Sequence, residues 1–407
     1  MKRPVIGIVT TWFERGAAYV SRAYRDALSE SCEVRIYARG GEQCARGDPW
    51  WDDADVWWAL PGPGRELTAI DRSDFERWFR ERRVELVLFN EQQWWPPVLW
   101  ARERGARTVA YVDYYTPETV PWFGVYDALW CNTRRHFSVF KEHPGARYIP
   151  WGTDLELFRP RGEARTDAIV FFHSAGMGGI NRRKGTDLLV EAFQQVQGPA
   201  RLVIHSQVPA STYGATGALL SQDPRIEFIE ATVPAPGLYH RGDVYVYPTR
   251  LEGIGLTVVE ALACGLPVIT TDVAPCSEFV VPSAAGWLVP VARTHRRGDG
   301  YYWPETECDV AALAAVMQQC VDRRDERLHW RRQAREFAEA HLDWRKNSQG
   351  LAAEVSELLA QPAGPVPARL RREILAAHPG RRNLVGRLRR RARRHLTELR
   401  AAIRRDR

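Results

Sequence analysis

The feature that most constrains the fold of this chain is a regular alternation of short apolar runs with segments of helical periodicity. Parallel strands joined by crossover helices are covered on both faces, which explains why the runs are almost continuously apolar. The first half therefore predicts a doubly wound parallel sheet. Its strand-like runs lie at residues 4–12, 32–39, 84–90, 107–115, 127–133 and 146–154.

The same alternation restarts after a stretch rich in Pro, Gly and charge at residues 157–167. A chain of 407 residues is too long for one core, so two α/β domains are expected, at residues 1–160 and 161–343. Ligands bind at the carboxyl ends of strands in such sheets, and we expect the two domains to face a cleft. The second set of strand-like runs lies at residues 167–174, 200–207, 225–232, 243–249 and 267–273.

Charge and cysteine content exclude several classes of protein. The net charge is +7, but the last forty residues hold fifteen Arg and three acids, a net charge of +12, so residues 1–367 carry −5. The seven scattered cysteines form no C-x-x-C pair, which predicts neither a disulfide framework nor a zinc knuckle. No run reaches the roughly 18 apolar residues of a membrane span, and the N-terminus is expected to be a buried strand. A cytoplasmic protein is therefore expected.

The segment from Tyr247 to Asp272 carries the most specific functional pattern, with the order strand, loop, helix, turn and strand. Gly253 and Gly255 let the backbone approach a ligand closely. The amides of Gly255, Leu256 and Thr257 lie where a helix begins, and a helix N-terminus favours an anion such as a diphosphate. The segment therefore predicts a binding site for a diphosphate.

Two glutamates accompany this anion site. Glu252 lies in the loop and Glu260 lies on the helix, with seven residues between them. This spacing suits one carboxylate that reaches into the cleft and another that holds a vicinal diol. The alternative is a purely structural role, in which Glu252 caps the helix and Glu260 is solvated on its outer face.

A second segment, residues 171–193, contains a strand, a glycine-rich loop and a helix, with Arg182, Arg183 and Lys184 before the helix. Cations on such a loop would hold a diphosphate and neutralise it as a leaving group. A solvated basic turn that caps the helix is the alternative interpretation for all three residues.

The frame P-T-x-x-E-G-x-G-L-T-x-x-E-A-x-A-x-G-x-P-V-I resembles the signature of the retaining glycosyltransferases of family 4, which have the GT-B fold. The resemblance covers about residues 1–360 and is stronger in the second half. It implies that Glu252 contacts donor-sugar hydroxyls near the reacting centre and that Glu260 binds the nucleotide ribose. Lys184-Gly185 matches a Lys-Gly pair of the family, so Glu252 and Lys184 are the candidate catalytic residues.

The chain departs from the family pattern at two places. No cation lies between Ser174 and Asn181, where the family has an arginine, so Arg182 or Arg183 is a substitute at the diphosphate. The family's histidine after the strand at residues 107–115 is absent, and Asp113 and Tyr114 stand there instead. They are candidate contacts to the donor sugar or the acceptor, and capping of a turn by Asp113 is the alternative.

Three further candidates lie after strands of the first half. Gly16 follows the first strand, where the family has a glycine-containing loop that touches the donor phosphate and the acceptor. Asn90 and Glu91 follow the strand at residues 84–90 and suit a sugar acceptor. The nearby Trp94 and Trp95 are interpreted either as acceptor contacts or as core or subunit contacts.

The C-terminal part is similar to a closing helix of this fold at residues 344–360, which crosses back to the N-terminal domain. A Pro-rich linker and an Arg-rich amphipathic helix occupy residues 361–407. This tail has three interpretations. It could contact an anionic membrane surface or be a disordered, solubilising end, and contact with a nucleic acid is the least favoured of the three.

The resemblance implies a metal-independent glycosyltransferase that moves a sugar from a UDP- or GDP-sugar to a glycan, lipid-linked or small-molecule hydroxyl with retention. Envelope polysaccharide or glycoconjugate synthesis is the expected setting, with docking at the inner face of the cytoplasmic membrane. Neither metal nor resident cofactor is expected, since the ten histidines show no metal-ligand spacing. A non-catalytic sugar-nucleotide or glycan-binding protein, and a nucleotide-sugar epimerase, are the alternatives.

Overall fold

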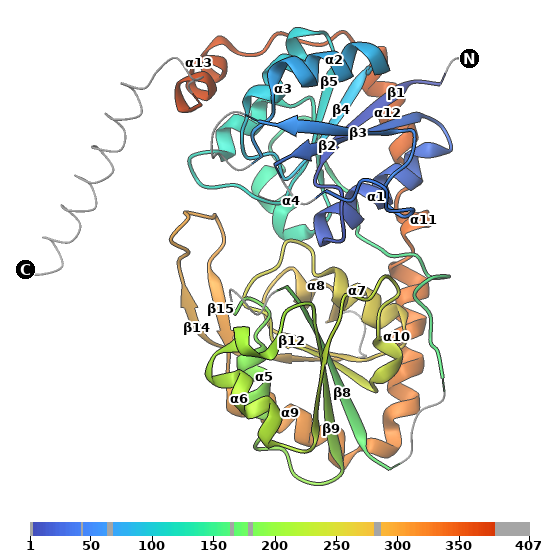
Figure 1. Ribbon diagram of the computed structural model, residues 1–407, viewed down its shortest axis with the longest axis vertical. Coiled ribbons are helices and arrows are strands. Elements are labelled where there is room, and N and C mark those ends of the chain that lie inside the picture. The colour runs from blue at the N-terminus through green and yellow to red at the C-terminus, as the bar shows by residue number, and fades with distance from the viewer. Residues whose placement is uncertain are drawn as a thin grey trace, which may run out of the picture. The chain divides into compact units, whose positions relative to one another are not determined.

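The computed structural model describes residues 3–41, 44–62, 68–162, 167–177, 182–280 and 286–378. These residues contain two parallel sheets flanked by helices (Figure 1). The first sheet has the order β3-β2-β1-β4-β5-β6-β7, and the second has the order β10-β9-β8-β11-β12-β13. The two doubly wound, Rossmann-like sheets predicted from the sequence are thereby confirmed.

The strands of the first sheet are β1 (Val5–Thr10), β2 (Glu33–Gly40), β3 (Val56–Pro61), β4 (Leu86–Asn90), β5 (Arg107–Tyr111), β6 (Ala128–Cys131) and β7 (Ala146–Tyr148). The strands of the second sheet are β8 (Ile169–Gly176), β9 (Ala200–Ser206), β10 (Ile226–Glu230), β11 (Val244–Tyr247), β12 (Val268–Thr271) and β13 (Gly286–Val289). The antiparallel pair β14 (Val291–His295) and β15 (Glu305–Cys308) forms a separate hairpin.

The helices of the first half are α1 (Gly16–Ser29), α2 (Arg72–Arg82), α3 (Pro96–Glu103) and α4 (Arg134–Phe140). Those of the second half are α5 (Thr186–Phe193), α6 (Ala215–Gln222), α7 (Leu256–Ala263), α8 (Cys276–Val280), α9 (Val310–Asp322) and α10 (Arg327–His341). Near the C-terminus follow α11 (Trp344–Asn347), α12 (Leu351–Ala360) and α13 (Ala368–Ala377).

Local sequence explains where several helices begin. Asp71 accepts a hydrogen bond from the Asp74 amide at 3.0 Å, and Asp309 accepts one from the Ala312 amide at 2.9 Å. Each carboxylate thereby satisfies one of the free N–H groups in the first turn of a helix. These two residues set the starts of α2 and α9.

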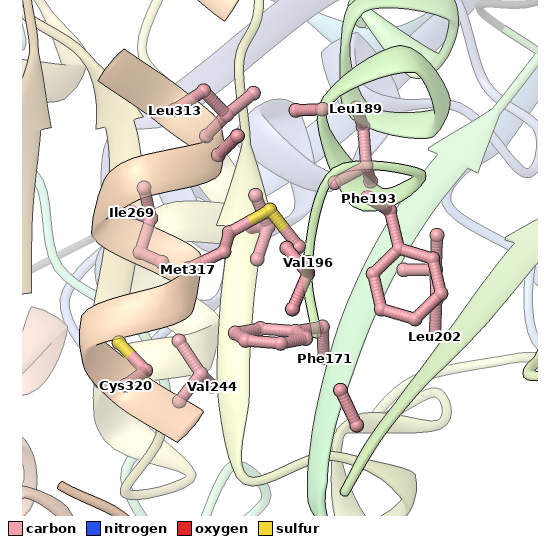
Figure 2. Packing of buried hydrophobic residues seen from close by; sticks show 14 of the residues in the cluster. Phe171, Leu189, Phe193, Val196, Leu202, Val244, Ile269, Leu313, Met317 and Cys320 are labelled. Atoms are coloured by element: carbon pink, nitrogen blue, oxygen red, sulfur yellow. The ribbon is translucent and has the colours of Figure 1, made fainter. Parts of the chain in front are cut away.

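The core of the second sheet lies between the strands and the helices α5 and α9 (Figure 2). Leu313, Met317 and Cys320 recur at helical spacing on α9 and are completely buried. Leu189 and Phe193 do the same on α5, four residues apart. Burying large apolar side chains contributes roughly 1.5–3 kcal/mol each, so this cluster supplies a rigid base for the loops that follow β8 and β11.

The described residues divide into two compact units. One holds residues up to Ala110, residues 121–127 and residues from Val355, and the other holds residues 111–120 and 128–354. This division differs from the boundary expected at residue 160. Glu278 explains part of the difference, because its carboxylate accepts hydrogen bonds from the Arg134 and Arg135 amides at 2.7 and 2.8 Å and so ties α4 to α8.

The predicted basic tail is described only at its start, in α13. Ile374 on this helix is completely buried, and Arg371 pairs with Glu103 of α3 at 2.9 Å. Residues 379–407, which include the predicted amphipathic helix, lie outside the described part of the chain. No helix among the described residues is long and apolar enough to cross a membrane.

Candidate active site

The strand order of the second sheet reverses at β8, because β9 pairs with one edge of this strand and β11 pairs with the other edge. Ligands of doubly wound sheets bind at such a switch point, outside the carboxyl ends of the strands. The loops that follow β8 and β11 end at Lys184-Gly185 and at Gly255. Both segments singled out in the sequence therefore belong to the switch point of one sheet.

Glu252 is the centre of this site. Its side chain is 9% exposed, and its carboxylate accepts hydrogen bonds from the Lys184 ammonium at 2.8 Å, the Tyr247 hydroxyl at 2.8 Å and the Thr249 hydroxyl at 3.0 Å. Three donors of this kind hold a carboxylate in one orientation. The two predicted catalytic residues thus form a direct ion pair.

The environment keeps Glu252 ionised. Burial alone would raise the pKa of this carboxyl group, but the positive charges of Lys184 and Arg183 and the hydrogen bonds outweigh burial and lower the pKa to about 2. Glu252 is therefore an acceptor of hydrogen bonds at neutral pH. It is not a proton donor.

Gly185 joins the two loops. Its φ is +70°, and a Cβ atom there would lie 2.0 Å from the carbonyl oxygen of Pro248. The Arg183 carbonyl accepts a hydrogen bond from the Arg250 amide at 2.7 Å. Only glycine fits this contact without strain, and the contact brings Lys184 to Glu252.

The two arginines before Lys184 behave differently. Arg182 is exposed and its guanidinium pairs with Asp187 in the first turn of α5, with Nε 3.0 Å from the carboxylate. Arg183 is half-buried, and its charge helps to lower the pKa of Glu252. Of the two candidates, Arg183 thus brings its charge to the site.

Gly253 and Gly255 in the second loop are each restricted to glycine, for different physical reasons. A Cβ atom on Gly253 would lie 2.0 Å from Oδ1 of Asp113. Gly255 has a φ of +91° and is the N-cap of α7, so the amides of Leu256 and Thr257 open that helix as predicted. The structure thereby places Asp113 directly against the loop that holds Glu252.

Glu260 lies on α7 and is half-buried. Its carboxylate accepts a hydrogen bond from the Tyr239 hydroxyl at 2.5 Å. Burial, together with the charge of Glu260, raises the pKa of Tyr239 well above its ordinary value, so this tyrosine stays protonated and keeps donating. Tyr239 holds the Glu260 carboxylate in place.

The hairpin β14–β15 is an element that the sequence reasoning missed. Its loop contacts the segment that carries Asp113: the Tyr301 ring stacks on the Tyr114 ring at 5.1 Å, and the Tyr301 hydroxyl donates to the Asp113 carbonyl at 3.0 Å. The Gly-Asp-Gly triplet at residues 298–300, followed by Tyr-Tyr-Trp, is the sequence signal that marks this turn.

The candidates of the first unit have structural partners there. The Asn90 side chain is buried and donates to the Ala17 carbonyl at 2.8 Å and to the Ser21 hydroxyl at 2.7 Å, both on α1. Glu91 has a φ of +50° and lies 3.6 Å from the Arg15 guanidinium. Gly16 is the first residue of α1.

The two tryptophans after β4 are core residues of the first unit. Trp94 packs edge-on against Trp100 at 5.4 Å, and Trp95 packs against Phe123 at 5.0 Å. Both side chains are buried, which favours the core interpretation over the acceptor interpretation.

In the part of the chain that the structure describes, no group of three or more His, Cys, Asp or Glu side chains could hold a metal ion. All seven cysteines are free thiols, and six of them are buried.

Residues 171–296 match the family model described as "Glycosyl transferases group 1". The chain is 30% identical over 216 residues to a D-inositol 3-phosphate glycosyltransferase of Pseudarthrobacter chlorophenolicus, a match that covers 47% of this chain and 51% of that protein. It is 32% identical over 158 residues to the lipopolysaccharide core biosynthesis mannosyltransferase LpcC of Rhizobium leguminosarum bv. viciae, over 35% and 44% of the two chains. The chain thus spans about half the length of these curated relatives.

Among solved structures, the chain resembles Anabaena Alr3699/HepE in complex with UDP and glucose. The TM-score is 0.66 at 15% identity, and the match covers 88% of this chain and 100% of that chain. At this identity the likeness shows the fold, and the GT-B fold expected from the sequence is confirmed.

Proposed function

We propose that this protein is a retaining, metal-independent glycosyltransferase that uses a UDP- or GDP-sugar as its donor. The observation that carries the proposal is the buried ion pair of Glu252 and Lys184 at the switch point of the second sheet, beside the N-terminus of α7. The match of residues 171–296 to the glycosyl transferases group 1 supports it, since these residues include the whole arrangement.

In the proposed complex, the diphosphate lies at the first amides of α7 and near the Lys184 ammonium. Lysine has three N–H donors, and the described residues account for two of them through Tyr247 and Glu252. The third is available for a phosphate oxygen. Glu260 would accept hydrogen bonds from the ribose hydroxyls, and Glu252, with Asp113 and Tyr114, would contact the sugar.

The proposed reaction breaks the bond between the anomeric carbon and the diphosphate oxygen, which leaves with the electron pair. Lys184 and the α7 amides stabilise the negative charge that grows on this oxygen in the transition state. The acceptor hydroxyl attacks the same face of the sugar and gives its proton to the departing diphosphate. The ionised Glu252 stabilises the positive charge that develops on the sugar ring.

The proposed acceptor is a hydroxyl group on a glycan, a lipid-linked glycan or a small molecule, in the synthesis of envelope polysaccharide or glycoconjugates. The names of the two curated relatives, one for inositol phosphate and one for a lipopolysaccharide core, support this range. We further propose a cytoplasmic protein whose Arg-rich residues after α13 contact an anionic membrane surface.

Isothermal titration with UDP, GDP, UDP-glucose and GDP-mannose tests the proposal. We expect one nucleotide to bind selectively, and Glu260→Ala to weaken its binding on the order of tenfold, since hydrogen bonds to a charged group are lost. Glu191→Ala, on the exposed side of α5, is the matched control and should bind as the unchanged protein does. A folded protein that binds none of the four compounds would contradict the proposal.

A further inference from the structure

His136 is a buried polar residue that the proposed reaction does not use. It lies in the first turn of α4, and its side chain is completely enclosed. Its Nδ1 lies 2.9 Å from the Tyr115 hydroxyl, and its Nε2 lies 3.0 Å from the carbonyl oxygen of Gly253. The ring thus connects the segment after β5 with the loop that carries Glu252.

The chemistry of the partners determines where the protons are. The Trp303 indole can only donate, and its Nε1 lies 2.6 Å from the Tyr115 oxygen, so that oxygen accepts and its own proton points to Nδ1 of His136. The Gly253 carbonyl can only accept, so Nε2 of His136 carries a proton. The bonds therefore run in one direction, from Trp303 through Tyr115 and His136 to Gly253.

Arg135, the neighbour of His136, holds the preceding carbonyl group. Its guanidinium donates to the carbonyl oxygen of Glu252, and also to that of Ala274 at 2.5 Å. Two consecutive carbonyl groups, those of Glu252 and Gly253, are thus held by two consecutive residues of α4. In a trans peptide the N–H points away from the C=O, so the amides of Gly253 and Ile254 face away from Arg135 and His136.

The orientation of these two amides matters for the site. Among the described residues, neither amide donates a hydrogen bond to a backbone carbonyl group. Together with the amides of Gly255, Leu256 and Thr257 they form a run of donors that leads into the N-terminus of α7. If either peptide flipped, it would present a carbonyl oxygen in place of an N–H group, and an anion would be repelled.

We propose that Arg135 and His136 form a carbonyl clamp, anchored through Tyr115 to Trp303 of the β14–β15 hairpin, that keeps the Gly253 and Ile254 amides turned toward the donor substrate. Both are positioning residues, since they act through the backbone of the Glu252–Ile254 loop. This inference rests on the proposed function for the identity of the substrate. The hydrogen-bond chain itself is testable without any substrate.

The first test is the tautomer of His136, measured by NMR on protein with ¹⁵N-labelled histidine, with the resonance assigned by its loss in His136→Gln. We expect a neutral ring with its proton on Nε2 that does not titrate between pH 5 and 8, because burial and the charge of Arg135 lower the pKa of His136 to about 3. A proton on Nδ1, or a ring that titrates in this range, would overturn the inference.

The second test is the affinity for UDP-glucose and GDP-mannose, with UDP and GDP as comparison. His136→Leu removes the donor to Gly253, and we expect affinity to fall on the order of tenfold, while His136→Gln restores an N–H group and recovers most of the affinity. Tyr115→Phe keeps the ring that packs on Phe140 at 4.9 Å and should lower affinity severalfold. His341→Gln, at the exposed end of α10, is the control.

The two possible failures differ. If the unchanged protein binds no nucleotide, the proposed function fails, and the role of the clamp fails with it. If the unchanged protein binds normally and folded His136→Leu and Tyr115→Phe bind equally well, the clamp alone is wrong.

Discussion

The loops of the second unit and the candidate residues of the first unit use polar side chains in different ways. In the second unit, Lys184, Tyr247 and Thr249 all converge on the carboxylate of Glu252. In the first unit, the buried amide of Asn90 donates to α1 and so holds its own fold together. A convergence of donors on one ionised group indicates a binding or catalytic site, whereas hydrogen bonds to a neighbouring helix indicate a structural role.

This comparison predicts that changes around Glu252 alter donor chemistry and that changes around Asn90 alter stability. Each of the following variants can break or sharpen the distinction.

The largest effect is expected for Glu252→Gln. The variant keeps the shape of the side chain but removes the negative charge opposite Lys184, so we expect turnover of the donor to fall by about a thousandfold, a loss typical of a removed electrostatic stabiliser. The measurement is the rate of nucleotide diphosphate release. Glu227→Gln, at the partly exposed pair with Arg241, is the matched control. Unchanged turnover in Glu252→Gln would place the chemistry elsewhere.

The next largest effect is on folding, in Gly185→Ala. A Cβ atom at this residue would meet the Pro248 carbonyl oxygen at 2.0 Å at a φ of +70°, so we expect a loss of about 3 kcal/mol in the free energy of unfolding, from strain and overpacking together. Gly105→Ala separates the two causes. Its φ is +83° but nothing lies within 4 Å, so strain alone should cost about 1 kcal/mol in urea unfolding. Equal losses would contradict the close contact.

Asn90→Ala tests the first unit. The variant removes two buried hydrogen bonds to α1, and we expect the free energy of unfolding to fall by about 2 kcal/mol. The affinity for the donor nucleotide should stay within twofold. If instead stability is unchanged and use of an acceptor sugar is lost, Asn90 belongs to the acceptor site and the distinction between the units fails.

The smallest effect concerns pH. Because the pKa of Glu252 is lowered to about 2 from an ordinary value of 4.5, its contribution to stability is present above pH 4.5 and is lost as the pH falls toward 2. The difference in thermal stability between the unchanged protein and Glu252→Gln should therefore be constant from pH 5 to 8 and shrink below pH 4.5. A difference that changes between pH 6 and 8 would mean that Glu252 titrates there.

Much of the fold could be predicted because its signals are local. The apolar runs at β1, β8 and β11 and the Gly-Leu-Pro end of α7 need no knowledge of distant residues. The hairpin β14–β15 could not be recognised in this way. All five residues of β14 are exposed, so the strand has no alternation of apolar and polar side chains, and its pairing depends on β15 ten residues later.

The candidate site divides in the same manner. Glu252, Glu260 and Lys184 were found because glycines and a helix start frame them at short range. The direct ion pair between Glu252 and Lys184 could not be predicted, because it depends on the contact of Gly185 with Pro248. His136 escaped notice because its partners, Tyr115 and Gly253, lie 21 and 117 residues away along the chain.

The measurement that tests the central claim most directly is the release of UDP from UDP-glucose or of GDP from GDP-mannose. It compares the unchanged protein with Glu252→Gln, and water is the acceptor in both assays. The account predicts slow turnover of one donor by the unchanged protein and a loss of about a thousandfold in the variant, without loss of folding. Selective binding of a donor with no turnover, or equal turnover in both proteins, would contradict the claim that the Glu252–Lys184 pair performs sugar transfer.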